Sequence, residues 1–370
     1  MLIGVPKEIK NNEYRVGLTP ASVREVVGHG HEVLVEKDAG GGIGASDANY
    51  VAAGARIAAE AEEVFARAQM IVKVKEPQPV ERKRLRRGQV LFTYLHLAPD
   101  PEQARDLMAS GAIAVAYETI TAPGGGLPLL APMSEVAGRL AVQAGAHCLE
   151  KSQGGMGILL GGVPGVPPAK IAVLGGGVAG SNAARMAVGA GARVYVLDRN
   201  VEVLRKLETE FGARVVTVFS SRDAVEQHVL SADLVIGAVL VPGAPAPKLV
   251  SRAMVKAMKA GAAVVDIAID QGGCFETSRP TTHADPIYVV DNVVHYCVTN
   301  MPGAVPRTST YALNNATLPF VLALADKGWK RALADDAHLR HGLNVAAGKV
   351  THPEVAAALG AAYVPADHLI

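Results

Sequence analysis

Three glycines and a downstream aspartate are the residues whose spacing points most clearly to chemistry. Gly175, Gly177 and Gly180 form a G-x-G-x-x-G pattern directly after the apolar residues 171–174, and Asp198 ends another apolar run roughly 20 residues later. The first glycine of this pattern permits a tight turn, the second lets a pyrophosphate approach the backbone, and the third allows close packing of a helix. The pattern predicts a dinucleotide-binding site.

The helix that follows these glycines would bind the pyrophosphate. Val178 and Ala179 fall in its first turn, where free N–H groups and the helix dipole favour an anion. Asp198 would accept hydrogen bonds from the ribose hydroxyls and repel a 2′-phosphate, which favours NAD over NADP, although the adjacent Arg199 weakens this preference. Because the chain has 39 glycines, the alternative is a glycine-rich turn in another α/β domain.

Polar residues also follow two strands expected in the first third of the chain. Lys75 follows the mostly apolar residues 71–74, and His96 follows residues 91–95. In a parallel sheet both would lie at the carboxyl edge, where ligands bind, so their placement favours a site over the alternative of solvated loop residues. Arg15 lies in a polar connection before Thr19 and Pro20, a predicted helix N-cap and N1 pair, and its position alone predicts a surface residue.

Two aspartates mark the end of another predicted strand, residues 263–268. Asp266 lies inside the apolar run and is expected to be structural. Asp270 lies beyond the run, where it would face the nicotinamide end of a bound dinucleotide.

The elements that must position these residues form two sets of β-branched runs separated by alanine-rich helical stretches. This alternation is typical of α/β folds with parallel sheets. The first set comprises residues 2–5, 32–35, 70–74, 90–95 and 112–117, and the second comprises 171–174, 194–197, 215–219, 234–238, 263–268 and 287–290. We therefore predict two doubly wound parallel-sheet domains, the second a Rossmann domain.

Helical stretches are expected outside the strands as well. They cover residues 20–27, 134–150, 182–188, 316–326 and 334–339. The helix at 134–150 would carry the chain from the first domain to the second, with a boundary near residue 128. The stretch after Arg307 shows no third set of strands and is too short to form a domain of its own.

Composition excludes several other classes of protein. The 370 residues include 36 basic and 35 acidic side chains without a long run of one sign, so the charge pattern of a nucleic-acid-binding protein is missing. Residues 154–169 are uncharged but proline-rich and too short to span a membrane, and the first residues do not form a signal peptide. Cys148, Cys274 and Cys297 are too scattered for a disulfide framework or a zinc site, so we expect no metal and a cytoplasmic location.

Several long motifs resemble the alanine dehydrogenase and transhydrogenase α-subunit family, and NAD-dependent L-alanine dehydrogenases in particular. The resemblance runs from end to end of the chain. It includes GVPKEIKNNEYRVGLTP from Gly4, VKVKEP from Val72, PMSEVAGR from Pro132, the glycine pattern, VVDIAIDQGGCFETSRPTTH from Val264 and VTNMPGAVPRTST from Val298.

This resemblance implies roles for individual residues. Arg15 and Lys75 would hold the substrate carboxylate and carbonyl, while His96 and Asp270 would carry out acid–base chemistry. The implied NAD contacts besides Asp270 and the glycine turn are Ser134, Asp198, Ser220, Val239, Leu240, Ile267, Arg279, Val298, Asn300 and Met301. One departure is Val203, which replaces a basic residue often found five positions after the ribose-binding aspartate, so the resemblance implies that a secondary cofactor contact is missing here.

The resemblance also implies an architecture and a reaction. Residues 1–128 and 307–370 would form a substrate domain, residues 129–306 an NAD domain, with a cleft between them, and the protein would be a homohexamer. The implied reaction is the reversible NAD-dependent oxidative deamination of L-alanine to pyruvate and ammonium. Three alternatives stay open: a transhydrogenase subunit with a membrane partner, a nucleotide sensor without catalysis, and a dehydrogenase for larger amino acids of the saccharopine type.

Overall fold

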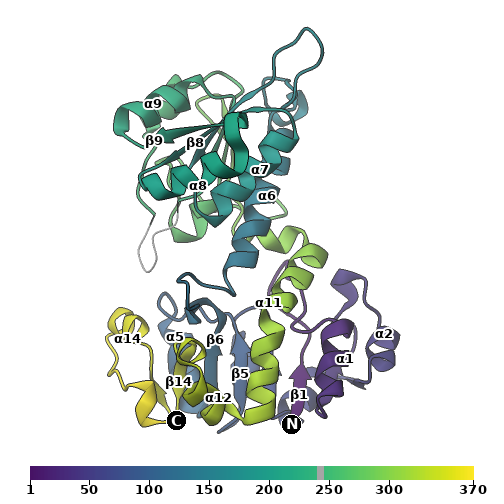
Figure 1. Cartoon of the computed structure of the whole chain (residues 1–370). Helices are drawn as coiled ribbons and strands as arrows, with labels where there is room; N and C mark the ends of the chain where they lie inside the picture. The colour runs from purple at the N-terminus through teal and green to yellow at the C-terminus, as the bar shows by residue number, and fades with distance from the viewer. Residues whose placement is uncertain (240–245) are drawn as a thin grey trace. The chain divides into compact units, whose positions relative to one another are not determined.

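The computed structural model describes residues 1–239 and 246–370, which form two α/β units (Figure 1). One unit comprises Met1–Met133 and Val305–Ile370, and the other comprises Ser134–Ala304. The chain thus leaves the first unit, completes the second and returns to the first.

The first unit contains a mostly parallel sheet. Its order is β15-β14-β6-β5-β4-β1-β2-β3. The strands are β1 (Leu2–Val5), β2 (Glu32–Glu36), β3 (Arg56–Ala58), β4 (Met70–Val72), β5 (Val90–Thr93), β6 (Ile113–Ala116), β14 (Leu343–Ala346) and β15 (Lys349–Val350). The parallel part has the doubly wound order 3-2-1-4-5-6, which reverses between β1 and β4, where such sheets bind ligands.

The stretch after Arg307 forms no third set of strands, but it adds two short strands to the first sheet that the sequence did not indicate. β14 pairs antiparallel with β6, and β15 pairs antiparallel with β14. These strands and β3 are only two to four residues long, so they show too little periodicity to be recognised in the sequence.

The second unit contains the dinucleotide-binding strand order. Its sheet runs β12-β13-β11-β10-β7-β8-β9. The strands are β7 (Lys170–Leu174), β8 (Arg193–Asp198), β9 (Val215–Phe219), β10 (Leu234–Gly237), β11 (Ala263–Asp266), β12 (Ile287–Val290) and β13 (Val293–Tyr296). The sixth parallel strand is β13, not residues 287–290 as expected, because β12 turns back and pairs antiparallel with β13 at the edge.

Helices surround each sheet. In the first unit they are α1 (Pro20–Gly28), α2 (Asp47–Ala52), α3 (Ala61–Arg67), α4 (Pro79–Arg82), α5 (Pro101–Ser110), α11 (Pro306–Lys327), α12 (Trp329–Asp335), α13 (Ala337–Arg340) and α14 (Pro353–Leu359). In the second they are α7 (Val178–Gly189), α8 (Val201–Phe211), α9 (Arg222–Ser231) and α10 (Arg252–Ala257), while α6 (Ala131–Cys148) begins at the end of the first segment and continues into the second unit. Thr19 caps α1 by accepting a hydrogen bond from the Ser22 N–H, as predicted.

Each sheet is covered by its own apolar core. Phe65, Ile71, Leu91 and Leu107 pack together in the first unit, and Leu174, Val235, Val264 and Phe275 in the second.

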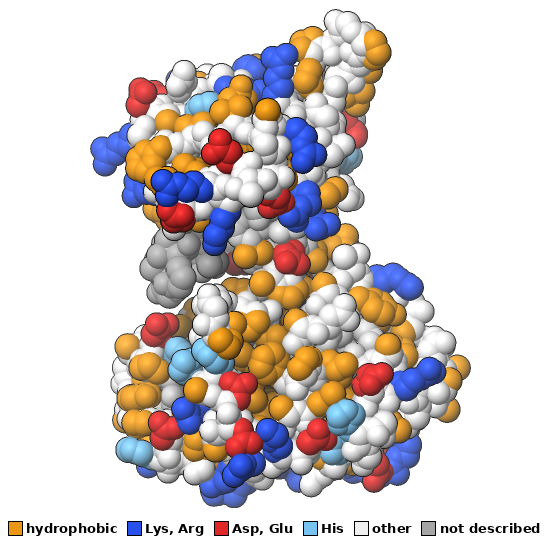
Figure 2. Space-filling model, in the orientation of Figure 1, with side chains coloured by type: hydrophobic (Ala, Val, Ile, Leu, Met, Phe, Trp, Pro, Cys, Tyr) orange, Lys and Arg blue, Asp and Glu red, His pale blue; other side chains and the backbone are white. Residues whose placement is uncertain are grey.

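Short 3₁₀ helices complete the chain: η1 (Gly41–Ile43), η2 (Tyr117–Thr119), η3 (Lys151–Gln153), η4 (Gly212–Arg214), η5 (Ile267–Gln271), η6 (Met301–Ala304) and η7 (Ala366–His368). On the face shown in Figure 2, acidic and basic side chains are interspersed on each unit. Among the described residues no helix is long and apolar enough to span a bilayer.

Candidate active site

The glycine turn connects β7 to α7 in the second unit. Gly175 has φ +99°, and a Cβ there would lie 2.8 Å from the carbonyl oxygen of Ala238. A Cβ on Gly180 would lie 1.8 Å from the carbonyl oxygen of Gly175, so the helix packs directly on the turn. Gly177 is exposed, and a Cβ on it would have no neighbour within 4 Å. These three environments fit a tight turn, close helix packing and an open approach for a pyrophosphate.

The predicted ribose-binding carboxylate lies beside this turn. Asp198 ends β8, and its Oδ2 accepts the Gly176 N–H at 2.7 Å while Oδ1 accepts the Asn200 N–H at 2.8 Å. Val203 lies against the same turn, with Cγ1 2.8 Å from the place where a Gly176 Cβ would be. Position 203 is therefore adjacent to both the turn and the carboxylate, and valine adds no charge there.

Further predicted cofactor contacts lie around the glycine turn. The Ser220 N–H donates to the Asp198 carbonyl at 3.0 Å, and Val239 Cγ2 lies 3.2 Å from the place of a Gly175 Cβ. Ser134 lies on α6, one turn before Gly138, where α6 approaches the first turn of α7 so closely that a Cβ on Gly138 would be 2.1 Å from the Ala179 carbonyl oxygen. Leu240 falls outside the described residues.

Asp266 organises the loop that follows β11. This buried carboxylate accepts hydrogen bonds from the Ala268 N–H at 3.1 Å, the Cys274 N–H at 2.9 Å and the Ser278 hydroxyl at 2.5 Å. Burial raises the pKa of Asp266, and these hydrogen bonds oppose the rise. The contacts agree with the structural role expected for Asp266.

Asp270 and Asn300 come together at the carboxyl end of this sheet. Asp270 is exposed on η5, and both of its oxygens face the Asn300 N–H at a long 3.4 Å. Asn300 has φ +56°, and its carbonyl oxygen contacts His283 Nε2 at 3.2 Å.

The remaining predicted NAD contacts differ in how far they are buried. Val298 and Met301 are buried, Ile267 is half-buried, and the Arg279 guanidinium lies over the Tyr288 ring, 4.0 Å from its centroid.

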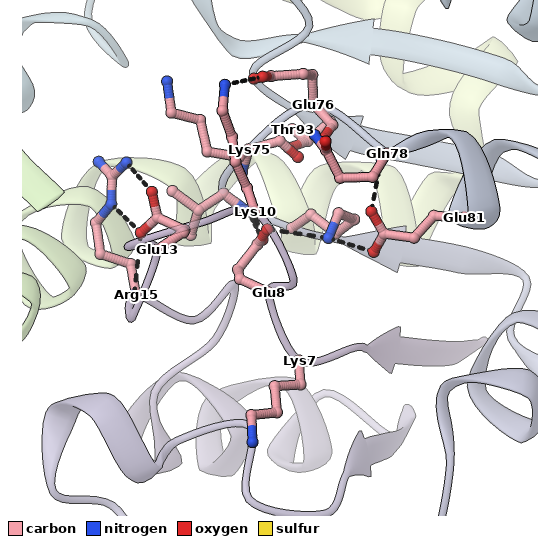
Figure 3. A network of polar contacts seen from close by, with 12 residues as sticks. Lys7, Glu8, Lys10, Glu13, Arg15, Lys75, Glu76, Gln78, Glu81 and Thr93 are labelled. Atoms are coloured by element: carbon pink, nitrogen blue, oxygen red, sulfur yellow. Dashed lines mark hydrogen bonds and ion pairs between the residues drawn. The ribbon is translucent and has the colours of Figure 1, made fainter. Parts of the chain in front are cut away.

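Arg15 lies in the first unit and is buried, so the expectation of a surface position is wrong. Only 2% of the residue is exposed, because Glu13 binds the guanidinium through two parallel hydrogen bonds. Nε donates to Glu13 Oε1 at 2.7 Å and Nη2 donates to Oε2 at 2.6 Å (Figure 3). Nη1 points to the Met133 sulfur at 3.1 Å. The Nε edge of the guanidinium is thus occupied by Glu13.

Lys75 follows β4 and is held through its backbone. Glu8 Oε1 accepts the Val74 N–H at 2.7 Å and the Lys75 N–H at 3.3 Å, and the Thr93 hydroxyl donates to the Lys75 carbonyl at 3.0 Å (Figure 3). The neighbouring Glu76 carboxylate pairs with Lys10.

Glu8 belongs to a buried group of three charges. The Lys73 ammonium donates to Glu8 Oε2 at 3.0 Å and to Glu81 Oε1 at 2.7 Å, and Lys73 is fully buried. Burial raises the pKa of Glu8, Glu81 adds to the rise, and Lys73 opposes it. Burial alone would lower the pKa of Lys73, but the two carboxylates outweigh this effect and raise it.

His96 follows β5 on the same sheet edge and is exposed. The Tyr94 ring stacks on its imidazole, with centroids 5.8 Å apart and planes 6° from parallel. Burial raises the pKa of Tyr94, and the positive charge of Arg15 partly offsets the rise. Tyr94 therefore interacts with both residues, stacking on the His96 ring and responding to the charge of Arg15.

The structure reveals carboxylates that the sequence reasoning missed, namely Glu8, Glu13 and Glu118. Each accepts a backbone N–H from a predicted site residue: Lys75, Arg15 and His96, respectively. A charged Lys73 inside an apolar run was the signal that could have revealed the first of them. Within the described ranges, no group of three or more histidine, cysteine or acidic side chains is arranged to hold a metal ion.

Comparison with known proteins relates both units to one family. Residues 4–137 match the family model "Alanine dehydrogenase/PNT, N-terminal domain", and residues 141–353 match the model "Alanine dehydrogenase/PNT, C-terminal domain". The alanine dehydrogenase of Halomonas elongata is 64% identical over 370 residues, covering 100% of both chains.

Two solved structures extend the comparison. An L-alanine dehydrogenase superposes with a TM-score of 0.95 at 55% identity, over 97% of this chain and 99% of its own. A transhydrogenase from Sinorhizobium meliloti superposes with a TM-score of 0.84 at 26% identity, over 95% of this chain and 100% of its own. Together with the two family models, these matches show that the chain belongs to the alanine dehydrogenase/PNT family.

Proposed function

We propose that this protein is an NAD-dependent L-alanine dehydrogenase. The reaction converts L-alanine, NAD⁺ and water into pyruvate, ammonium, NADH and a proton, and the same site serves both directions. The observation that carries the proposal is the full-length identity of 64% to an alanine dehydrogenase, in a chain that has Arg15, Lys75 and His96 around one sheet edge.

In this proposal the second unit binds the dinucleotide, and the first binds the amino acid. NAD, when bound, accepts the hydride from the substrate Cα. The open backbone at Gly177 supports a pyrophosphate site, and the Asp198 carboxylate supports preference for unphosphorylated ribose. The other proposed cofactor residues are those predicted from the sequence, and the proposed limits of the NAD domain are residues 129–306.

Arg15 would bind the substrate carboxylate. A guanidinium can bind a carboxylate through two parallel charge-assisted hydrogen bonds, and Glu13 holds the Arg15 guanidinium in place through Nε and Nη2. Lys75 would polarise the carbonyl of pyruvate as it forms, with its backbone held by Glu8 and Thr93.

His96 and Asp270 would handle the proton transfers. Hydride loss leaves an imino acid, water adds to its carbon, and ammonium departs. Imidazole suits the group that takes and returns protons in these steps, because its ordinary pKa is near 6.5. Asp270 would position the water and stabilise the positive iminium, a charge that develops during the reaction.

The proposal also covers the location, the oligomeric state and the partners of the enzyme. We propose a cytoplasmic homohexamer that acts on L-alanine, pyruvate and ammonium, without a nucleic-acid or membrane partner. Measurement of molecular mass in solution tests the hexamer.

The deciding experiment follows the absorbance of NADH when purified protein is mixed with NAD and L-alanine at alkaline pH. D-alanine, saccharopine and NADP serve as controls. NADH formation with L-alanine alone supports the proposal, whereas NAD binding without turnover favours the transhydrogenase or sensor alternative. Formation with saccharopine favours the larger-substrate alternative.

Two variants test the individual roles. His96→Ala is expected to lower turnover by about 10²–10⁴-fold, the usual contribution of general acid–base catalysis. Arg15→Ala is expected to raise the Michaelis constants for alanine and pyruvate. Unchanged values in either variant would assign the role to another residue.

A further inference from the structure

The backbone of His96 adopts a conformation that residues other than glycine seldom adopt. Its φ is +50°, in the left-handed region where a side chain with a Cβ is strained. Such residues persist only where surrounding contacts fix them, and they concentrate at functional sites. The contacts that fix this turn therefore decide where the imidazole lies.

One carboxylate supplies most of these contacts. Glu118 Oε1 accepts the His96 N–H at 2.6 Å, and both Glu118 oxygens accept the Leu95 N–H at 3.2 Å. Glu118 lies on η2, directly after β6, the strand that pairs with β5. A side chain from one strand end thus closes the turn at the end of the neighbouring strand.

Two further contacts complete the support. The Gln103 side-chain amide donates to the Leu95 carbonyl oxygen at 2.6 Å, and the Tyr94 ring stacks on the imidazole. The peptide units on either side of Leu95 are thereby fixed, at the N–H by Glu118 and at the carbonyl by Gln103. The His96 side chain itself is exposed, so its direction depends on this backbone and on Tyr94.

We propose that Glu118 is a positioning residue, which holds the turn at Leu95 and His96 so that the imidazole is placed for proton transfer. This inference rests on the proposed dehydrogenase function and deepens it. Glu118 acts through His96 and need not touch the substrate. A charged acceptor suits the task because hydrogen bonds to a carboxylate are roughly twice as strong as bonds between neutral groups.

The test is a cycle of variants: Glu118→Ala, His96→Ala and the double variant, each assayed in both directions. Glu118→Ala is expected to lower kcat about 10–100-fold, because a displacement near 1 Å can cost about 10²-fold. The Michaelis constants for alanine and pyruvate should change little, since Arg15 and Lys75 keep their own partners. In the double variant kcat should match that of His96→Ala within about twofold.

Two matched variants separate positioning from loss of structure. Glu118→Gln keeps an acceptor oxygen and should retain most of kcat. Glu62→Gln removes an exposed carboxylate paired with Arg84 in the same unit and should leave kcat unchanged. If Glu118→Ala lowered kcat equally with and without His96, or if Glu118→Gln fell as far as Glu118→Ala, the positioning role would be wrong.

The outcomes also distinguish this inference from the proposed function. A wild-type protein that forms no NADH from L-alanine contradicts the function itself. An active wild type with an equally active Glu118→Ala variant contradicts only the positioning role.

Discussion

The two sheets share one strand order but have differently built carboxyl edges. In both, the parallel strands run 3-2-1-4-5-6. At the edge of the first sheet, buried carboxylates hold charged side chains and the backbone beside them, as Glu13 does for Arg15 and Glu8 for Lys75. At the edge of the second, glycines shape the turn between β7 and α7, and the Asp198 carboxylate accepts the Gly176 N–H beside it.

The difference follows from what each edge is proposed to recognise. A small amino acid offers little apolar area, so charges must orient it, and those charges need partners of their own when buried. A dinucleotide offers a pyrophosphate and a ribose, which backbone N–H groups and one carboxylate are enough to bind. Substitutions at the two edges should therefore affect different properties of the protein.

The largest effect is expected from Lys73→Met. This change removes the buried ammonium that donates hydrogen bonds to both Glu8 and Glu81. Breaking a buried ion pair from one side costs about 3–5 kcal/mol, because the remaining charges are left uncompensated. The free energy of unfolding in urea measures this loss. Lys83→Met, at an exposed lysine nearby, is the control and should cost less than about 0.5 kcal/mol.

The loss in Lys73→Met should depend on pH. The pKa of Glu8 is already raised above its ordinary 4.5, and removal of the ammonium raises it further. A carboxyl with a raised folded-state pKa contributes stability below 4.5 and loses it as the pH rises through the folded-state value. The variant should therefore recover stability relative to wild type as the pH falls toward 4.5. If the difference in unfolding free energy between variant and wild type did not change with pH, the pairing of Lys73 with Glu8 would not be what stabilises this edge of the sheet.

Alanine substitutions at two glycines of the second sheet edge should affect different properties, namely stability and NAD binding. Gly180→Ala places a Cβ 1.8 Å from the Gly175 carbonyl oxygen, so we expect a stability loss of about 1–3 kcal/mol. Gly177→Ala meets no neighbour within 4 Å and should keep its melting temperature while its Kd for NAD rises on the order of tenfold. Calorimetry and NAD titration measure the pair, and equal melting temperatures would contradict the packing role of Gly180.

Asp198→Asn tests the carboxylate that accepts the Gly176 N–H beside the glycine turn. Its amide oxygen can still accept the Gly176 N–H, but the repulsion of a 2′-phosphate is lost. We expect the ratio of kcat/KM for NAD over NADP to fall about fivefold to tenfold, because charges near the surface interact by about 1 kcal/mol or more at 4 Å. A ratio equal to that of wild type would assign cofactor choice to another residue.

The smallest effect is expected from Val203→Arg. This change adds a cation beside the glycine turn, where Val203 contacts the place of a Gly176 Cβ. An exposed charge pair contributes about 0.2–1 kcal/mol, so the Kd for NAD should fall less than about fivefold. High salt should remove the gain, and a gain that persists in salt would indicate a packing effect instead.

The sequence by itself determined much of the second unit. The glycine spacing, the apolar run before it and Asp198 after it are local patterns, because the turn and the helix follow each other in the chain. Apolar runs similarly located most parallel strands of both sheets, and Lys75 and His96 were found at strand ends for the same reason. The short β3, β14 and β15 carried too little pattern, and β13 was missed beside β12.

Only the tertiary structure decided how the charges of the first unit are paired. Glu8 and Lys73 are 65 residues apart, and Glu118 and His96 are 22 apart, so no periodicity connects them. Arg15 was expected at the surface because a charged residue in a polar loop normally remains in water. Its partner Glu13 is only two residues away in the chain, but the fold buries the pair and places the distant Met133 sulfur against Nη1. Local patterns specify elements, whereas the burial of a charge depends on partners that folding brings together.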